Sequence, residues 1–430
     1  MPIRLDSQSA DFEPQFLALL GGKREASVEV GEVVSGIIAD VRARGDDALL
    51  ELTNKFDQTE FTAEALRFTE DEIEAAVARV TPEVTAALQT AHDRIRAHHE
   101  KQKPEDQIYE DHLGVTLGTL WTPVEAVGIY VPGGLASYPS SVLMNAVPAH
   151  VAGVERIAMV VPTPRGQYSA SILAAARIAG VTEIYRVGGA QAVAALAYGT
   201  ATIKPVDKIV GPGNAYVATA KRQVFGHVGI DMIAGPSEVL VIADGSANSA
   251  WVAADLIAQA EHGAGAQSIL VTTEKGLADA VAAEVERQLA VLPKQDIARD
   301  GWNEFGAIIT VASLDQAVTL ANRIASEHVE LAVNEPQALI GRIRNAGALF
   351  LGHHTPEAIG DYVGGTNHVL PTARSARFAS GLGVLDFMKR TSVLGCDASS
   401  LSALAGAAVT MAEVEALDGH GRSISIRLNR

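Results

Sequence analysis

Apolar positions along the chain follow two spacings, and the change between them predicts where helices give way to strands. From about residue 30 to residue 103, apolar residues recur every three or four positions, which is typical of helices with one buried face. The segment GVTLGTLWTPV then predicts a strand. From Val127 onward, short apolar runs end in turns, and a helical pattern follows each run: VGIYVPGG, RIAMVVPTP, EIYRVGGAQ and DKIVGPGN. Strands that alternate with helices predict a parallel sheet with helices on both faces.

A second series of the same kind follows the first. It consists of EVLVIADG, QSILVTT, AIITV, VELAV and ALFLG, each with a helical pattern after it. We therefore predict the α/β class, with two doubly wound modules in succession.

The last thirty residues form a small segment of their own. Glu415 lies on a predicted helix, His420 stands between two glycines, and Ile424, Ile426 and Leu428 then alternate as in a strand. A helix and a strand this short cannot bury a core, so we expect the segment to dock on another part of the protein.

Composition narrows the class of protein. A chain of 430 residues is too long for one ordinary core, so two or more domains are expected. Its 48% of hydrophobic residues indicate a globular protein. The net charge of −17 argues against a nucleic-acid partner, because phosphates need a basic surface.

Cysteine content and the N-terminus predict the compartment. The single cysteine, Cys396, excludes an internal disulfide and favours a reducing compartment; we interpret it as a buried or idle thiol. The first 16 residues lack the apolar run of a signal peptide. The uncharged segment 126–154 contains too many prolines and glycines for a membrane helix. We expect a cytoplasmic protein without a membrane segment.

Three glycine turns of the first series, VPGG, VGGAQ and VGPGN, lie where open α/β sheets bind ligands. Glycine alone would explain any one tight turn, but three in succession indicate a nucleotide-sized pocket. The dinucleotide fingerprint is absent, since Tyr216 occupies its third glycine position, and there is no Walker A motif. Any cofactor would therefore be held in a different way.

A polar stripe interrupts the apolar helix predicted from Trp251 to Ala260. Asp255, Gln259 and His262 are spaced i, i+4 and i+7, which places them on one helical face. The carbonyls at a helix end favour a cation, and imidazole is a good zinc ligand. A lone histidine at a helix end is more often a cap or a surface residue, so a metal site here needs further ligands.

Two more segments supply candidates for the site. In SEHVEL, a helix is expected to end at Glu327 and His328, which could serve two separate roles, although a solvated helix end is the more common outcome. In AIGDYVGGTNHVLPT, Asp361 stands ahead of a glycine loop and could ligate a metal. His368 in the same loop could also be a ligand, but a structural role is more common.

Six motifs together resemble the histidinol dehydrogenase family. They are QAEHG, SEHVEL, GDYVGGTNHVLPT, YVPGG, GGAQAVAALAYGT and GPGNAYV, and they occur in the family's order from about residue 25 to the C-terminus. The resemblance implies an enzyme that oxidises L-histidinol twice, through L-histidinaldehyde, to L-histidine with two NAD. It also implies two incomplete Rossmann-like domains with small terminal segments, and a homodimer whose C-terminal tail completes the partner's site.

The resemblance also implies the residues of the site. One zinc ion per site would be held by Gln259, His262, Asp361 and His420. NAD would contact Tyr130, Gln191 and Asn214. The substrate would contact Ser237, Gln259, His262, His328, Asp361, Glu415 and His420. Asp255 is not among the family's ligands and would at most support them.

The same resemblance assigns the catalytic roles. His328 would take the proton of the carbinol hydroxyl, since an imidazole titrates near neutral pH. Glu327 would activate the water that hydrates the aldehyde, zinc would orient the substrate, and NAD would carry out the redox step.

Two other enzyme classes remain open. Related zinc- and NAD-dependent enzymes oxidise other small polar alcohols, including sulfonated diols, but Glu327, His328 and Glu415 favour histidinol. A metallohydrolase would leave the three glycine turns without a purpose. A binding module without catalysis would leave both the base and the metal site unexplained.

These considerations predict a division of the chain into four parts. We expect an N-terminal tail (1–25), a zinc- and substrate-binding α/β domain (26–129 and 238–383), an NAD-binding α/β domain (130–237) and a C-terminal dimerisation tail (384–430).

Overall fold

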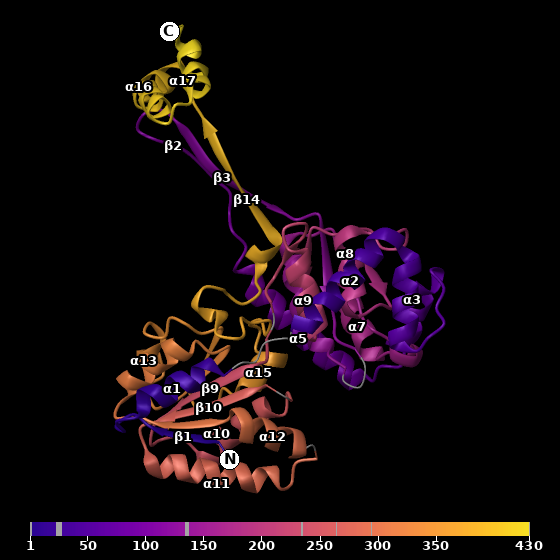
Figure 1. Cartoon of the computed structure of the whole chain (residues 1–430), viewed down its shortest axis with the longest axis vertical. Coiled ribbons are helices and arrows are strands. Elements are labelled where there is room, and N and C mark those ends of the chain that lie inside the picture. The colour runs from indigo at the N-terminus through magenta and orange to yellow at the C-terminus, as the bar shows by residue number, and fades with distance from the viewer. Residues whose placement is uncertain are drawn as a thin grey trace.

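The computed structural model describes residues 2–22, 28–133, 137–233, 235–263, 265–293 and 295–429. Within these ranges the chain forms two parallel sheets, of five and six strands, and one antiparallel sheet of three strands. Figure 1 shows the parallel sheets in two separate bodies and the antiparallel sheet in an arm that projects away from both. The predicted α/β class is confirmed. Gly134 of the VPGG turn and the predicted boundary at residues 25 and 26 lie outside the described residues.

The five-stranded sheet contains the first predicted series and has the order β6-β5-β4-β7-β8, with every neighbouring pair parallel. Its strands are β4 (Ala126–Tyr130), β5 (Arg156–Val160), β6 (Glu183–Tyr185), β7 (Lys208–Val210) and β8 (Gly229–Ile230). Its connecting helices are α6 (Pro139–Ala152), α7 (Ala170–Ile178), α8 (Gly189–Tyr198) and α9 (Ala215–Val224). The direction of winding reverses between β4 and β7, which is where open α/β sheets bind ligands.

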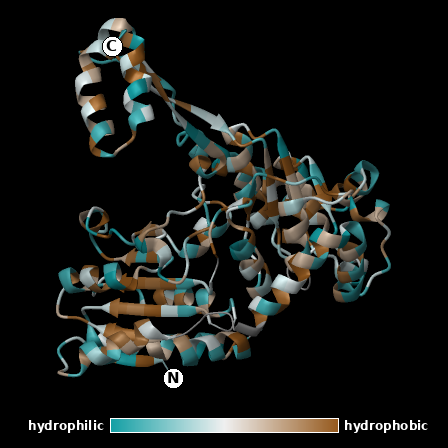
Figure 2. Ribbon diagram, turned by 45° about the horizontal axis from the view of Figure 1, so that its top comes forward, coloured by the Kyte–Doolittle hydropathy of each residue, from teal (hydrophilic) through white to brown (hydrophobic). Residues whose placement is uncertain are grey.

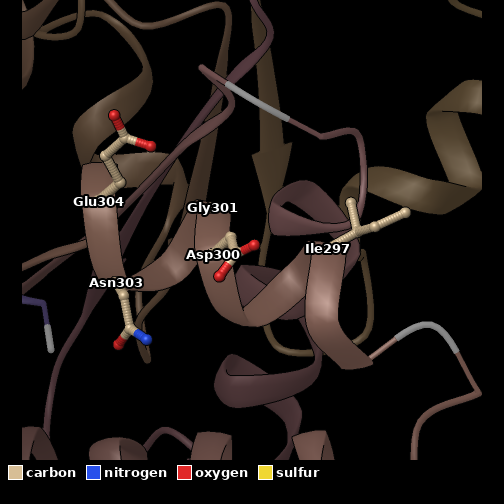
Figure 3. Close-up of a pocket in the computed structure, with 5 residues that line it drawn as sticks. All are labelled: Ile297, Asp300, Gly301, Asn303 and Glu304. Carbon is tan, nitrogen blue, oxygen red and sulfur yellow. The ribbon is translucent and has the colours of Figure 1, made fainter.

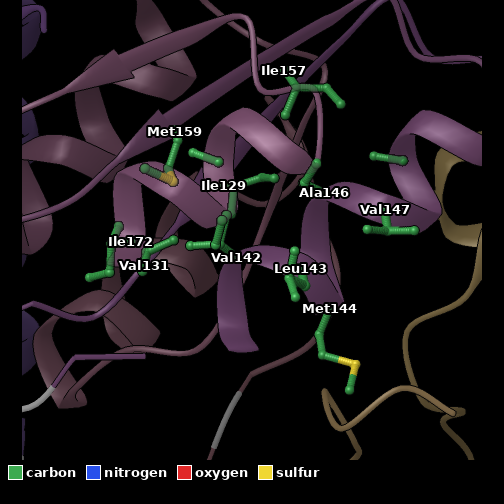
Figure 4. Packing of buried hydrophobic residues seen from close by; sticks show 14 of the residues in the cluster. Ile129, Val131, Val142, Leu143, Met144, Ala146, Val147, Ile157, Met159 and Ile172 are labelled. Carbon is green, nitrogen blue, oxygen red and sulfur yellow. The ribbon is translucent and has the colours of Figure 1, made fainter. Parts of the chain in front are cut away.

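Side chains of β4 alternate between two cores, as the two-residue period of a strand requires. Val127 and Ile129 enter one core, and Ala126 and Tyr130 enter the other. Figure 4 shows the first core, in which Ile129 lies among the apolar side chains of α6 and neighbouring strands. Both faces of the sheet are therefore covered, which explains why its strands are apolar throughout.

The N-terminal helices cover this same five-stranded sheet. They are α2 (Val28–Arg44), α3 (Asp46–Asp57), α4 (Glu70–Val77) and α5 (Pro82–Glu100). Val34 and Ile38 of α2 pack in the core of Tyr130, and Leu88 of α5 packs in the core of Ile129. The prediction that grouped residues 26–129 with 238–383 is therefore wrong for these helices. An apolar stripe shows that one face of a helix is buried, but it does not show against which sheet that face packs.

The six-stranded sheet has the order β1-β11-β10-β9-β12-β13 and is parallel throughout. Its strands are β1 (Ile3–Asp6), β9 (Glu238–Ala243), β10 (Gln267–Thr272), β11 (Ala307–Thr310), β12 (His328–Ala332) and β13 (Ala348–Leu351). From β9 onward it repeats the winding of the first sheet. Figure 2 shows apolar strands between helices that carry polar outer faces.

Seven helices of the described chain accompany this second sheet: α1 (Phe12–Gly21), α10 (Ser249–Ala260), α11 (Lys275–Leu289), α12 (Gln295–Phe305), α13 (Leu314–Ile324), α14 (Gln337–Ile340) and α15 (Glu357–Tyr362). The predicted N-terminal tail belongs to this body, because β1 pairs with β11 and Phe16 of α1 is fully buried in the core. Short 3-10 helices occur at Glu64–Leu66, Pro164–Gly166, Ser375–Arg377 and Val384–Phe387.

The arm joins two distant parts of the chain. Its sheet consists of β2 (Gln107–Glu110), β3 (Thr116–Pro123) and β14 (Met388–Gly395), and it leads to α16 (Ala398–Val414) and α17 (Asp418–Ser425). The strand predicted from Ile424, Ile426 and Leu428 is wrong, because Ile424 lies in α17 and Ile426–Leu428 form a 3-10 helix. Ile424 and Leu428 are half-buried while Ile426 is exposed, so the pattern is that of a helical i, i+4 pair.

Segment 126–154 is divided between β4 and α6. Among the helices of the described chain, none combines the length and the apolar character that crossing a membrane requires.

We expect Gly360→Ala and Gly36→Ala to change stability in opposite directions, although both glycines lie in helices. A Cβ at Gly360 would lie 2.6 Å from Cε1 of the Phe350 ring, so the substitution overpacks α15 and should lower the free energy of unfolding by about 1–3 kcal/mol. A Cβ at the exposed Gly36 meets no atom within 4 Å and should raise that free energy by up to about 1 kcal/mol. Urea denaturation of both variants measures this, and a stabilised G360A would contradict the packing.

Candidate active site

A cleft of about 480 Å³ lies between the two parallel sheets. On the side of the five-stranded sheet, it is lined by residues that follow β4 and β7, including Gly211 and Asn214. On the side of the six-stranded sheet, it is lined by Ser237, just before β9, and by Glu327 and His328 at the start of β12. The carboxyl ends of one sheet therefore face the amino ends of the other.

The turn after β7 is fixed by a buried ion pair between Lys221 and Asp231. Lys221 Nζ donates to the carbonyl oxygen of Gly211 at 2.9 Å, and Asp231 Oδ2 accepts from the Gly211 N–H at 2.8 Å. Gly211 has a φ of +107°, and a Cβ there would lie 2.2 Å from the Tyr130 carbonyl oxygen. Sequence reasoning missed Lys221 and Asp231, although a lysine on the apolar face of α9 was a visible signal.

The structure brings two of the three predicted NAD residues to the cleft. The Tyr130 hydroxyl accepts from the Gly189 N–H at 3.0 Å, and burial raises the pKa of Tyr130 to about 12. Asn214 caps α9, because its Oδ1 accepts from the N–H groups of Tyr216 and Val217 at 3.0 and 3.2 Å. Gln191 is buried in the first turn of α8 and is not among the described residues that line the cleft.

Glu327 is held at the amino end of the second sheet. Its Oε2 accepts from Ser237 Oγ and, at 3.0 Å, from the Glu238 N–H. Burial raises the pKa of Glu327 to about 8, although these two hydrogen bonds lower it. The prediction that a helix ends at Glu327 and His328 is wrong: α13 ends at Ile324, and Ala325 follows with a φ of +53°.

His328 is oriented by a backbone hydrogen bond. Its Nδ1 lies 3.0 Å from the carbonyl oxygen of Glu238. A carbonyl oxygen can only accept, so Nδ1 carries the proton and Nε2 keeps its lone pair. Nε2 has no hydrogen-bond partner within the described ranges, and burial lowers the pKa of the ring. His328 is therefore a neutral imidazole whose free nitrogen can accept a proton.

Three side chains beside His328 form a set of donors for a metal ion. His262, Glu357 and Asp361 offer ligand atoms that all lie within 4.8 Å of one another. Gln259 is fully buried; its Oε1 accepts from Ser237 Oγ at 3.4 Å, and its Nε2 has no partner in the described structure. Imidazole and carboxylate groups suit zinc, so these residues fit the implied ion.

The composition of this set differs in part from the predicted one. His262 and Asp361 come together as predicted, and Gln259 lies one helical turn before His262. Glu357 was missed, although it stands four residues before Asp361, the spacing that places two side chains on one helical face. His368, for which a structural role was favoured, lines the same cleft, and its Nδ1 donates to the Asp361 carbonyl oxygen at 3.0 Å.

Glu415 and His420 are exposed on the arm. Figure 1 shows α17 far from α10 and α15 of the same chain. Within one chain, therefore, the structure does not bring these two predicted residues to the cleft.

A second hollow, of about 550 Å³, lies on the outer surface of α12. It is lined by Ile297, Asp300, Gly301, Asn303 and Glu304 (Figure 3). The two carboxylates stand apart and face solvent, and no histidine or cysteine is among the lining residues. This hollow offers no set of groups for catalysis.

Comparison with known proteins identifies the family. A family model described as histidinol dehydrogenase matches residues 22–428. The chain is 64% identical over 429 residues to the histidinol dehydrogenase of Nitrobacter winogradskyi, covering 100% of both, and 64% identical to that of Agrobacterium fabrum, covering 100% and 99%. The crystal structure of the histidinol dehydrogenase from Elizabethkingia anophelis matches with a TM-score of 0.95 at 37% identity, covering 100% and 98%. The chain therefore belongs to the histidinol dehydrogenase family.

Proposed function

We propose that this protein is a zinc-dependent dehydrogenase that oxidises L-histidinol through L-histidinaldehyde to L-histidine with two NAD, the last steps of histidine biosynthesis. Family membership supports the substrate. The observation that carries the chemistry is the neutral, buried His328, whose free Nε2 lies in the same cleft as Glu327 and the donors of His262 and Asp361.

The residues that would hold zinc are Gln259, His262 and Asp361, together with His420 of a second copy of the chain. Bound zinc would orient the amine and imidazole of the substrate. Glu357 stands in the same donor set, and burial together with the charge of Asp361 raises its pKa well above the usual range. A neutral Glu357 would donate a hydrogen bond at this position.

In the first half-reaction, His328 Nε2 takes the proton of the carbinol hydroxyl, and a hydride leaves the same carbon. Tyr130, Gln191 and Asn214 would hold NAD, which would supply the hydride acceptor. In the second half-reaction, Glu327 takes a proton from the water that adds to the aldehyde. Only the ionised form of Glu327 can take this proton, and with a pKa of about 8 that form is the minor one at neutral pH, so this step should become faster as the pH rises toward 8. Ser237 donates to Oε2 of the same side chain.

The arm supports an assembly in which two copies complete each other's sites. Glu415 and His420 are exposed at its far end, where they are free to reach a partner. The exposed apolar residues Met411, Val414 and Leu417 on the same segment fit burial against that partner. We place this enzyme in the cytoplasm, where an exposed free thiol such as Cys396 stays reduced.

An assay with histidinol and NAD, with and without a chelator, tests the proposal directly. We expect two reduced NAD per histidinol, loss of activity on chelation, and recovery when zinc is added. Circular dichroism should change little, because the candidate metal site lies outside the four hydrophobic cores. Oxidation of other alcohols but not histidinol would favour the related dehydrogenases, and hydrolysis without NAD reduction would favour a metallohydrolase.

Measuring the two half-reactions separately should distinguish the roles of His328 and Glu327. His328→Asn removes the accepting nitrogen and should slow histidinol oxidation by about 10²–10⁴-fold. Glu327→Gln should leave that step within a few-fold of wild type and slow oxidation of added histidinaldehyde. Rapid-mixing measurements of NAD reduction from each substrate give both rates. Equal loss of both half-reactions in both variants would contradict this division.

Asn214→Ala and Asn248→Ala form a matched pair for the NAD site. Each asparagine caps a helix through Oδ1, which accepts from two backbone N–H groups, so each change should lower the free energy of unfolding by about 1 kcal/mol. Only Asn214 lines the cleft, so only N214A should weaken NAD binding, measured by titration calorimetry. Similar NAD affinities in the two variants would contradict the proposed position of NAD in the cleft.

Mixed dimers test whether the arm acts on the partner's site. Asp361→Ala and His420→Ala should each be inactive, but a dimer containing one chain of each would hold one intact site. After the two are unfolded together and reassociated, about half the dimers are mixed, so about a quarter of wild-type activity should return. No recovery, with mixed dimers demonstrated by differently tagged chains, would show that the arm serves its own chain.

A further inference from the structure

Helix α15 carries Asp361, but few interactions within the helix fix the position of the helix. It spans six residues, Glu357–Tyr362, and its N-cap residue, Pro356, provides no side-chain hydrogen bond. The N–H groups of a first helical turn need acceptors from elsewhere. The spacing of the donors on α15 from those on α10 therefore depends on contacts from neighbouring elements.

Glu330 of β12 supplies that contact. Its Oε1 accepts from the Glu357 N–H at 2.6 Å, and its side chain is buried, with 3% exposed. Glu330 follows His328 by two positions in the strand, so the two side chains leave the same face of the sheet. One strand thus presents the proposed base and, beside it, the acceptor that caps α15.

Asp255 of α10 holds the other side of Glu330 through a hydrogen bond between the two carboxyl groups. Such a bond requires that one group keep its proton. Burial and the charge of Asp255 raise the pKa of Glu330 well above its usual range, while burial raises that of Asp255 to about 6. Glu330 is therefore the group that donates to Asp255, and its Oε1 remains an acceptor for Glu357.

These bonds form a bridge from α10 through β12 to α15. Helix α10 leads to His262, with Asp255 one turn before Gln259, and α15 carries Asp361. Neither Asp255 nor Glu330 is among the described residues that line the cleft; both line a separate hollow of about 10 Å³. They are therefore not placed to contact a substrate in the cleft, and they are not among the described metal-donor residues.

We propose that Glu330, held by Asp255, is a positioning residue that fixes α15 against α10 and so sets the spacing of His262 and Asp361 for zinc. This inference rests on the proposed zinc site. Residues that orient metal ligands through hydrogen bonds typically change metal affinity by about 10–100-fold when they are removed.

Glu330→Gln and Glu330→Met separate the hydrogen bonds from the size of the side chain. Glutamine keeps an acceptor for the Glu357 N–H and a donor for Asp255, whereas methionine has a similar length and provides neither. The full-length protein is stripped of metal, and zinc affinity is measured by competition with a chromophoric chelator. We expect E330Q to bind zinc within about threefold of wild type, and E330M to bind it about 10–100-fold more weakly.

Two controls distinguish positioning from general loss of stability. Ser313→Ala removes the cap of α13, where Ser313 Oγ accepts from the Gln316 N–H, and should leave zinc affinity unchanged. NAD affinity should also be unchanged in E330M, because the proposed NAD residues belong to the other sheet. If E330M does not fold, Asp255→Ala removes the other end of the bridge and should weaken zinc binding in the same direction.

These measurements can contradict either the role of Glu330 or the zinc site on which it rests. Wild-type zinc affinity in a folded E330M or D255A overturns the inference, and so does equal weakening in E330Q and E330M. If the wild-type protein takes up no zinc at all, the proposed zinc site fails rather than the role of Glu330.

Discussion

The carboxyl ends of the five-stranded sheet face the amino ends of the six-stranded sheet, and the chemistry of the cleft depends on this opposition. Helices of a parallel sheet begin at its carboxyl ends, so α6 and α9 present N–H groups with partial positive charge to one side of the cleft. On the other side, α10 ends beside His262 and presents carbonyls with partial negative charge. An anionic cofactor and a cation are thus favoured on opposite walls by backbone alone.

Maintaining this cleft requires polar groups in places where water does not reach. Glu327, Glu330 and Glu357 are all buried, and burial is the main reason that their pKa values rise. Lys221 and Asp231 instead remain a buried ion pair that holds a glycine turn from both sides. Glu327 and Glu330 each accept from a backbone N–H, so the walls of the cleft are fixed by hydrogen bonds as well as by packing.

The strands were predictable because the signal for each lies within a few consecutive residues. Short apolar runs that end in turns predicted every strand from β4 to β13 except the short β8. The family resemblance then indicated Tyr130 and Asn214, which line the cleft. The polar stripe and the family motifs together indicated His262 and Asp361. Local patterns could not show which sheet α2–α5 cover, nor that β1 completes the second sheet, since both depend on contacts between distant segments.

The same limit applies to Glu357 and Glu330. The local signal of Glu357 was only its i, i+4 spacing to Asp361, and Glu330 inside its strand had none. The contact between Glu330 and the Glu357 N–H becomes visible only when α15 is placed beside β12. The alternation of Ile424, Ile426 and Leu428 was misleading because three positions fit both a strand and a helical i, i+4 pair.

The pairing of β3 with β14 has a consequence for the synthesis of the protein. Met388 pairs with Pro123, so β3 leaves the ribosome long before its partner strand exists. The strands and connecting helices of both parallel sheets lie in the chain before β14 and can fold while translation continues. The arm, which carries Glu415 and His420 at its far end, forms only when the chain is nearly finished. A truncated product would therefore contain most of both bodies yet lack the segment that we propose completes the partner's site.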